Sequence, residues 1–293
     1  MVKRSHLTRK SKGVFGTRSM DFIFENNKKW VDASLADDPM VFERLKNAQQ
    51  PTMLYIGCSD SRVPAQNMLG LTLGQLFVHR NVANLCINTD FSLLSVLTYA
   101  VEVLKVTDII VCGHYNCGGV RAAMENEDHG LLEHWLTYIR NVQRLHQAEL
   151  QEISDPELRH QRLVELNVQE QCMSLFANPI VQRRQAQEAL PRIHGWVYDV
   201  ATGLLKDVKI DFKAEIRKYK DIYRLYDFPR GSGNRNMSPK RAVGHVAKDD
   251  PLDHVLAASA PSYSNSNDAD HADDSGAEAV RAAVAAAAAA LSP

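Results

Sequence analysis

The sequence predicts an α/β protein with a mostly parallel central β-sheet flanked by helices. Two observations support this fold class. Short apolar runs bounded by glycine or other turn residues recur along the chain, and segments with helical spacing of apolar residues lie between them. Strands that alternate with helices form parallel sheets, because each helical crossover returns the chain to the same edge.

The strands are expected at four apolar runs and one short return segment, which follows a turn at Thr202 and Gly203: residues 52–57, 75–79, 108–113, 193–198 and 204–208. Residues 92–104 have the apolar spacing of a crossover helix that packs on the sheet, with Leu93, Leu97 and Val101 on one face. Residues 131–190 are predicted to be largely helical.

The two ends of the chain differ in composition from the middle. Residues 1–20 form a basic tail without acidic residues, which is typical both of a transit peptide and of a solvated tail. Residues 21–228 are expected to form the folded domain, and residues 229–293, rich in Ser, Asn, Asp and Ala, a low-complexity, disordered tail. The protein is expected to be soluble and intracellular. The basic tail leaves the choice between cytoplasm and mitochondrial matrix open.

The domain is expected to begin with a helical arm. Apolar residues recur at helical intervals between residues 20 and 46, and Asp37, Asp38 and Pro39 interrupt them, which predicts two helices. This N-terminal arm is expected to wrap around the domain or around a partner.

Composition excludes several classes of function. The 293 residues are 45% hydrophobic and 24% charged, which is ordinary for a soluble globular protein. A formal net charge of -1 gives no reason to expect nucleic acid or an anionic membrane as a partner. No apolar run reaches the ~20 residues that a membrane span requires. Five cysteines, an odd number without a secretory signal, indicate reduced thiols.

Two short stretches carry side chains suited to chemistry, and each follows a predicted strand. Cys58 follows the first strand, and His114 and Cys117 follow the third. The carboxyl ends of parallel strands lie at one edge of a sheet, so these side chains are expected to meet. Two thiolates and an imidazole suit Zn²⁺, and three protein ligands leave a fourth position for water. We therefore expect one catalytic zinc ion per subunit.

Asp60 and Arg62 extend this expected site. A carboxylate beside zinc could become the fourth ligand and exclude water, unless a bidentate guanidinium holds it away. Arg62 is placed to do this. Asp60 could then orient the nucleophile that the metal generates from water. Asp60 as a fourth ligand in an inactive form is the alternative.

Three blocks of sequence resemble the signatures of the β-class carbonic anhydrases. They are Ile-Gly-Cys-Ser-Asp-Ser-Arg-Val at 56–63, Phe-Val-His-Arg-Asn-Val-Ala-Asn at 77–84 and Cys-Gly-His-Tyr-Asn-Cys-Gly-Gly at 112–119. They agree with the family in order and spacing, and the resemblance covers roughly residues 21–225. It implies zinc-dependent, reversible hydration of carbon dioxide to bicarbonate and a proton. It also implies an obligate homodimer with its pocket at the subunit interface, and dimers that can pair into tetramers.

The resemblance assigns further residues to substrate binding. Gln49 matches the substrate-binding glutamine of the family, and Gly118 follows the second cysteine ligand. Phe77 and Tyr99 match the aromatic pocket wall, which is contributed across the dimer.

One subclass of the family also carries a second, non-catalytic bicarbonate site that stabilises a closed form. The matching positions are Tyr55, Arg80 and Tyr198. This subclass has tryptophan where the present chain has Tyr55, so regulation by bicarbonate is a hypothesis here.

Two other functions remain as alternatives: a catalytically silent relative with structural zinc, or a zinc hydrolase acting on carbon disulfide or carbonyl sulfide. The presence of both Asp60 and Arg62 argues against the silent relative. The remaining cysteines are interpreted as small buried hydrophobic residues: Cys86, Cys112 and Cys172.

Overall fold

The computed structural model describes residues 20–226, so the predictions for residues 1–19 and for the tail at 229–293 lie outside the described residues. The chain divides into two units between Ala48 and Gln49, and each unit is described here by itself. The expected domain boundaries at 21 and 228 stay predictions.

The first unit contains two helices, α1 (Asp21–Asp37) and α2 (Val41–Leu45), which confirms the predicted break at Asp37 to Pro39. Asp38 stabilises the connection, because its carboxylate accepts a hydrogen bond from the Met40 amide at 3.1 Å and pairs with Arg44. Neither helix has a buried residue. Large apolar side chains therefore remain open to solvent along α1: Phe22, Ile23, Phe24, Trp30 and Leu35.

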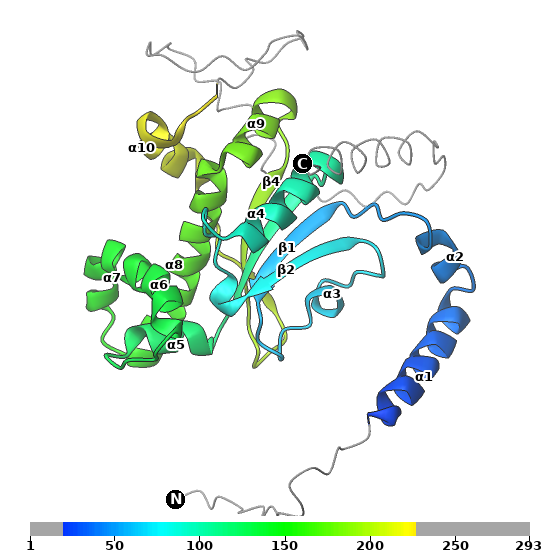
Figure 1. Cartoon of the computed structure of the whole chain (residues 1–293). Helices are drawn as coiled ribbons and strands as arrows, with labels where there is room; N and C mark the ends of the chain where they lie inside the picture. Colours follow the sequence, from blue (N-terminus) through cyan, green and yellow to red (C-terminus); the bar gives the residue numbers. More distant parts are fainter. Residues whose placement is uncertain (1–19, 227–293) are drawn as a thin grey trace, which may run out of the picture. The chain divides into compact units, whose positions relative to one another are not determined.

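The second unit is built on one five-stranded sheet with the strand order β2-β1-β3-β4-β5 (Figure 1). Strands β1 to β4 are parallel, and β5 is antiparallel to β4. The mostly parallel sheet and all five strand positions were predicted, and both are confirmed. The strands are β1 (Met53–Cys58), β2 (Leu76–Asn81), β3 (Asp108–His114), β4 (Arg192–Tyr198) and β5 (Leu205–Asp207).

Helices connect the strands, and most of them were expected. Those between β3 and β4 confirm the helical prediction for residues 131–190, whereas α10 was not predicted. The helices are α3 (Ala65–Met68), η1 (Val82–Asn84), α4 (Phe91–Thr98), η2 (Tyr99–Val103), α5 (Gly118–Met124), α6 (Leu132–Leu145), α7 (Gln147–Glu152), α8 (Pro156–Ala177), α9 (Pro179–Glu188) and α10 (Phe212–Tyr223).

The helix predicted at 92–104 ends differently from an ordinary α-helix. Its second half, η2, is a π-helical turn in which the Leu104 amide donates to the Tyr99 carbonyl at 2.9 Å. Apolar spacing does not reveal such a turn, because the turn is single and Leu93, Leu97, Ala100 and Val101 remain buried as in an ordinary helix.

Side chains alternate between the two faces of the sheet. On one face, Leu54 and Ile109 belong to the main core, which is completed by residues of α4, α5, α6, α8 and α9. The opposite face carries a smaller cluster that includes Tyr55 and Ile110. Within residues 20–226, no helix combines the length and apolar character needed to cross a membrane.

Helix α8 lies very close to the sheet, because two strands have glycine beneath it. A Cβ atom added at Gly113 of β3 would lie 2.7 Å from Val168, and one added at Gly195 of β4 would lie 3.1 Å from the same side chain. The residues of α8 therefore directly face the end of β3, next to His114, and the middle of β4.

Candidate metal centre

The structure brings Cys58, His114 and Cys117 together at the carboxyl end of the sheet. Cys58 ends β1, His114 ends β3, and Cys117 is the residue that caps α5. Their potential ligand atoms all lie within 4.8 Å of one another, and the two sulfur atoms are 3.9 Å apart. Zinc–sulfur bonds of about 2.3 Å in tetrahedral geometry place two sulfur ligands roughly 3.8 Å apart. The cluster therefore has the size of a zinc site.

His114 is oriented as a metal ligand. The side chain is fully buried, and its Nδ1 lies 3.0 Å from the Tyr115 carbonyl, to which it can donate a hydrogen bond. Its Nε2 is buried and has no hydrogen-bond partner among the described residues. An imidazole that donates one N–H to a carbonyl and leaves its other nitrogen free is the usual arrangement of a metal-bound histidine.

The two thiols have opposite pKa shifts. The Cys117 thiol, acting as a hydrogen-bond donor, lowers the pKa of Cys58, and the backbone amide of Ala83 adds to this effect from 3.3 Å. The hydrogen bond to Cys58, together with burial, raises the pKa of Cys117. The amides of Gly119 and Val120 at the start of α5 oppose that rise. The protein thus supplies hydrogen-bond donors to both sulfurs.

Asp60 and Arg62 form the bidentate pair that the sequence predicted. The guanidinium donates from Nε to Asp60 Oδ1 at 2.9 Å and from Nη2 to Oδ2 at 2.7 Å. These bonds lower the pKa of Asp60, so the carboxylate is held ionised. Asp60 Oδ2 lies 3.7 Å from His114 Nε2, and Arg62 also donates to the Asn116 carbonyl at 3.1 Å. The pair therefore lies beside the cluster and bridges the two loops that carry the ligands.

Arg80 of β2 fixes the segment that follows β1. Its guanidinium donates to the carbonyls of Cys58, Asp60 and Val63 at distances between 2.7 and 2.9 Å. An anion bound at Arg80 would have to compete with these three carbonyls.

The other two residues of the predicted regulatory site lie on the face of the sheet that carries the smaller cluster. Tyr55 is fully buried with its ring against Gly57, and Tyr198 packs against the same cluster. Burial raises the pKa of Tyr55. Regulation by bicarbonate stays a prediction. It can be checked by following the rate against bicarbonate concentration, and a simple hyperbolic dependence would speak against it.

The residues expected to bind substrate divide into two groups. Gly118 directly follows Cys117, and open space surrounds the position of its missing Cβ. Gln49 is exposed and precedes β1, whose first residue, Met53, lies about 17 Å along the strand from Cys58 at its other end. Phe77 and Tyr99 contact each other, with ring centroids 5.7 Å apart.

Sequence reasoning missed the backbone and side-chain groups that surround the ligands. The amide of Ala83 points at Cys58, and His160 of α8 lies with its Nε2 3.2 Å from the Cys117 carbonyl. Ala83 falls within the block 77–84 that resembles the family, but nothing in its side chain indicates a role. Cys86, Cys112 and Cys172 are buried free thiols, as expected.

Known proteins with the same sequence pattern support a family assignment. Residues 53–205 match the family model described as "Carbonic anhydrase". A carbonic anhydrase of Emericella nidulans is 49% identical over 212 residues, which are 72% of this chain and 92% of that protein. A solved β-carbonic anhydrase of Coccomyxa, in complex with acetazolamide, has a TM-score of 0.65 and 34% identity, and the match covers 70% of this chain and 100% of that one. The chain belongs to the β-class carbonic anhydrases.

A second solved β-carbonic anhydrase indicates how members of the family assemble. One of two tetrameric enzymes from Sordaria macrospora matches 65% of this chain and 96% of its own, with 35% identity and a TM-score of 0.62. The family match over residues 53–205 includes strands β1 to β4 and the thiol–imidazole cluster, so the candidate metal centre lies within the part of the chain that defines the family.

Proposed function

We propose that this β-carbonic anhydrase catalyses the reversible hydration of carbon dioxide to bicarbonate and a proton at the centre formed by Cys58, His114 and Cys117. The observation that carries the proposal is the buried Nε2 of His114, which has no hydrogen-bond partner among the described residues and shares a 4.8 Å cluster with two thiols. This donor set suits one zinc ion per subunit. Zinc, when bound, supplies a nucleophile from water at moderate pH.

The neighbouring side chains orient the reaction. Asp60, held ionised by Arg62, can accept a hydrogen bond from the attacking nucleophile and fix the direction of its lone pair. The bonds to Arg62 engage both oxygens of Asp60, which opposes its binding as a fourth metal ligand. The open space at Gly118 lets substrate approach the cluster closely.

The remaining substrate-binding positions support a homodimer. Phe77 is in register with Leu54, whereas Cys58 is in register with Asn81, so Phe77 lies about four residues, or roughly 13 Å, along the sheet from the ligand end. Gln49 lies beyond the same amino end. We infer that these residues complete the pocket of a second copy of the chain. Association of dimers into tetramers, as in the Sordaria enzymes, is compatible with this arrangement.

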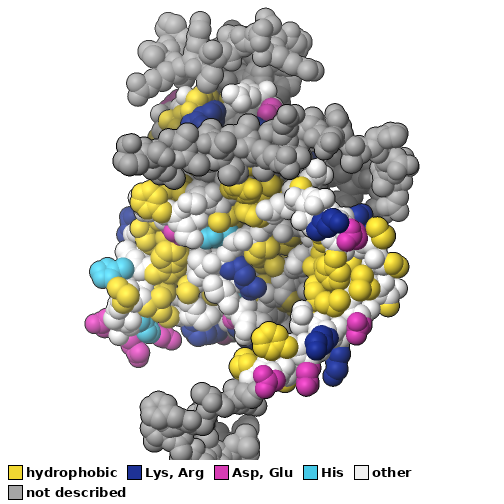
Figure 2. Space-filling model, turned by 45° about the vertical axis from the view of Figure 1, so that its right-hand side comes forward, with side chains coloured by type: hydrophobic (Ala, Val, Ile, Leu, Met, Phe, Trp, Pro, Cys, Tyr) yellow, Lys and Arg dark blue, Asp and Glu magenta, His cyan; other side chains and the backbone are white. Residues whose placement is uncertain are grey.

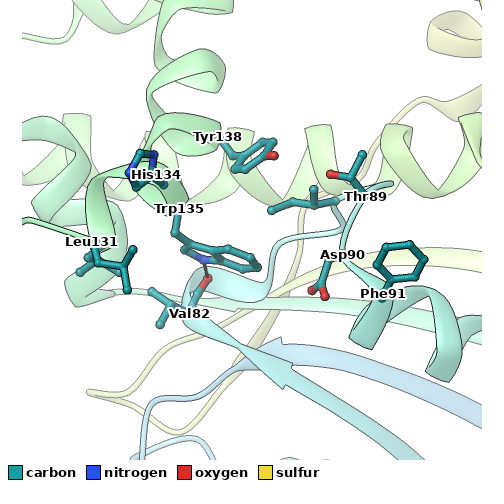
Figure 3. Close-up of a pocket in the computed structure, with 10 residues that line it drawn as sticks. Val82, Thr89, Asp90, Phe91, Leu131, His134, Trp135 and Tyr138 are labelled. Atoms are coloured by element: carbon teal, nitrogen blue, oxygen red, sulfur yellow. Dashed lines mark hydrogen bonds between the residues drawn. The ribbon is translucent and has the colours of Figure 1, made fainter.

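A groove next to the metal centre is the surface that we assign to the second copy. It has a volume of about 830 Å³ and runs between η1, the start of α4 and α6 (Figure 3). Trp135 reaches from α6 to donate its indole N–H to the Val82 carbonyl at 2.8 Å. Val82 also packs against Gly119, two residues after Cys117. The groove wall is thus joined to the ligand loops.

The rim of this groove is unusually apolar for a solvent-exposed surface. Phe91 is 83% exposed and Leu131 is 87% exposed. Hydrophobic side chains also gather in several groups on the face drawn in Figure 2, in place of the scattered single residues of a typical monomer surface. Burial of Phe91 and Leu131 against a second copy would remove this apolar area from water.

Phe91→Glu is therefore expected to weaken self-association about tenfold or more, since a charge would be buried at the contact. Sedimentation equilibrium over a range of protein concentrations measures this. Leu158→Glu is the matched control, because Leu158 is exposed on α8 and does not line the groove. An unchanged dimerisation constant for Phe91→Glu would remove the groove from the interface.

The proposed reaction is tested directly by stopped-flow measurement of carbon dioxide hydration together with a zinc count on the purified protein. We expect one zinc ion per chain and a rate that increases toward alkaline pH, because two thiolates reduce the electrophilicity of the ion. Stoichiometric zinc without hydration at alkaline pH would instead favour a silent relative in which the metal is structural.

A further inference from the structure

We propose that Asn167 of α8 is a positioning residue for the metal centre: it holds the carbonyl of Ala83 and thereby keeps the Ala83 amide aimed at the Cys58 sulfur. The proposal rests on the metal centre proposed above. It adds a residue from a distant part of the chain, with no ligand atom of its own, to the groups that set the properties of the site.

The amide of Ala83 is held in an unfavourable backbone conformation. Its N–H donates to Cys58 Sγ at 3.3 Å. Ala83 has φ 63° and ψ 30°, and the next residue, Asn84, has φ 50°. Two consecutive residues with side chains in the left-handed region are uncommon, and such backbone persists only where its surroundings hold it.

Side chains from three elements hold this turn. Trp135 donates to the Val82 carbonyl, and Asn81 pairs with both the amide and the carbonyl of Leu85. Asn167 Nδ2 donates to the carbonyl of Ala83 at 3.0 Å. Among these side chains, Asn167 is the one that bonds Ala83 itself, so it fixes the peptide plane that follows the donating amide.

Asn167 has little freedom to do anything else. Its side chain is 1% exposed, and its Oδ1 accepts a hydrogen bond from Gln171 Nε2 at 3.0 Å. Gln171 Oε1 in turn accepts a hydrogen bond from the Cys86 amide at 2.7 Å. Because the oxygen of Asn167 is used by Gln171, its NH₂ group must face Ala83. Val168, the next residue of α8, packs against Gly113 and Gly195 of the sheet. This close contact limits how far Asn167 can move from the Ala83 carbonyl.

The chemical effect concerns the Cys58 sulfur. A hydrogen bond from an amide withdraws electron density from a thiolate, and bonds of this kind tune the properties of a bound metal. Loss of the Asn167 contact frees the peptide between Ala83 and Asn84, so the left-handed conformation of Ala83 is held less firmly. The Ala83 N–H then points at Cys58 less steadily, although the bond from Trp135 to the Val82 carbonyl still restrains the peptide that carries it. Cys58 becomes a stronger electron donor, and the ligand loop becomes less well ordered.

Asn167→Leu tests the proposal, because leucine has a similar shape and no donor. Gln182→Leu is the matched control: Gln182 is also fully buried, donates to the Tyr223 carbonyl at 2.8 Å and accepts the Leu225 amide at 2.9 Å. Two properties are measured for each variant: the sulfur-to-metal charge-transfer band of the cobalt(II)-substituted protein, and the zinc dissociation constant by competition with a chelator.

We expect the band of Asn167→Leu to move to longer wavelength and its zinc affinity to fall on the order of tenfold. Gln182→Leu is expected to keep the wild-type band and affinity while losing thermal stability. Ala83→Gly in the Asn167→Leu background is expected to return the band toward the wild-type position, since glycine adopts the left-handed conformation without steric cost.

Equal bands and equal zinc affinities for the Asn167→Leu and Gln182→Leu variants would overturn the proposal and leave Asn167 as a packing residue. If Asn167→Leu does not fold, Asn167→Ala is interpreted in the same way, because alanine also removes the donor to the Ala83 carbonyl. Failure of the wild-type protein to bind cobalt or zinc would overturn the metal centre itself, so the two failures can be told apart.

Discussion

Cys58→Ser is expected to release the metal and to abolish measurable carbon dioxide hydration. Serine is not ionised near neutral pH, so the cluster would keep one thiolate and one imidazole. Loss of a direct ligand should exceed the ~10- to 100-fold affinity loss that is typical of changes around a ligand. Zinc analysis after gel filtration with a chelator, followed by stopped-flow kinetics, measures both effects.

Cys172→Ser is the control for this substitution. Cys172 is also a fully buried free thiol, but it lies in the main core and outside the 4.8 Å cluster. The same chemical change at Cys172 should therefore leave zinc content and rate unchanged. Wild-type zinc content in Cys58→Ser would remove Cys58 from the ligand set.

Asp60→Asn is expected to retain zinc but to lower kcat/KM by about 10²- to 10⁴-fold, the usual range for a group that handles or orients a proton. Asparagine is neutral, so it cannot hold Arg62 by two charge-assisted hydrogen bonds, and it orients the nucleophile less strongly. Rates and zinc content measured on the same preparation separate this loss from loss of metal.

Arg62→Lys provides the companion measurement. Lysine keeps the positive charge but cannot make the two parallel bonds to Asp60. If the two residues act as one unit, the double variant should be little worse than Asp60→Asn alone. Fully additive losses would show that Arg62 acts on the reaction independently of Asp60.

The fold was predictable because its strands and its helices follow different periods. All five strands fall where short apolar runs were found, and the break at Pro39 separates α1 from α2 as expected. Helix α10 was missed although Phe212, Ile216, Tyr219 and Tyr223 recur at helical spacing, and Phe212 and Tyr219 pack against the main core. The apolar pattern was present in the sequence, but the charged residues between these positions obscured it.

The grouping of Cys58, His114 and Cys117 was predictable for a topological reason. Parallel strands β1 and β3 are neighbours, so residues at or just after their carboxyl ends reach the same edge of the sheet. The hydrogen-bond donors around this cluster were not predictable, because they are backbone groups or come from distant helices. The contact of Arg80 with three carbonyls and the contact of Asn167 with Ala83 depend on peptide orientations that residue types do not encode.

The metal ligands and the proposed substrate-binding residues lie at opposite ends of the strands, and this arrangement has a genetic consequence. On the proposed two-fold arrangement, a chain that lacks Cys58 ruins its own pocket, whereas a chain that lacks Gln49 ruins the pocket of its neighbour. When two such defective chains pair, both faults fall on one pocket and the other is assembled entirely from sound parts. Two inactive alleles could thus complement each other within a single mixed dimer.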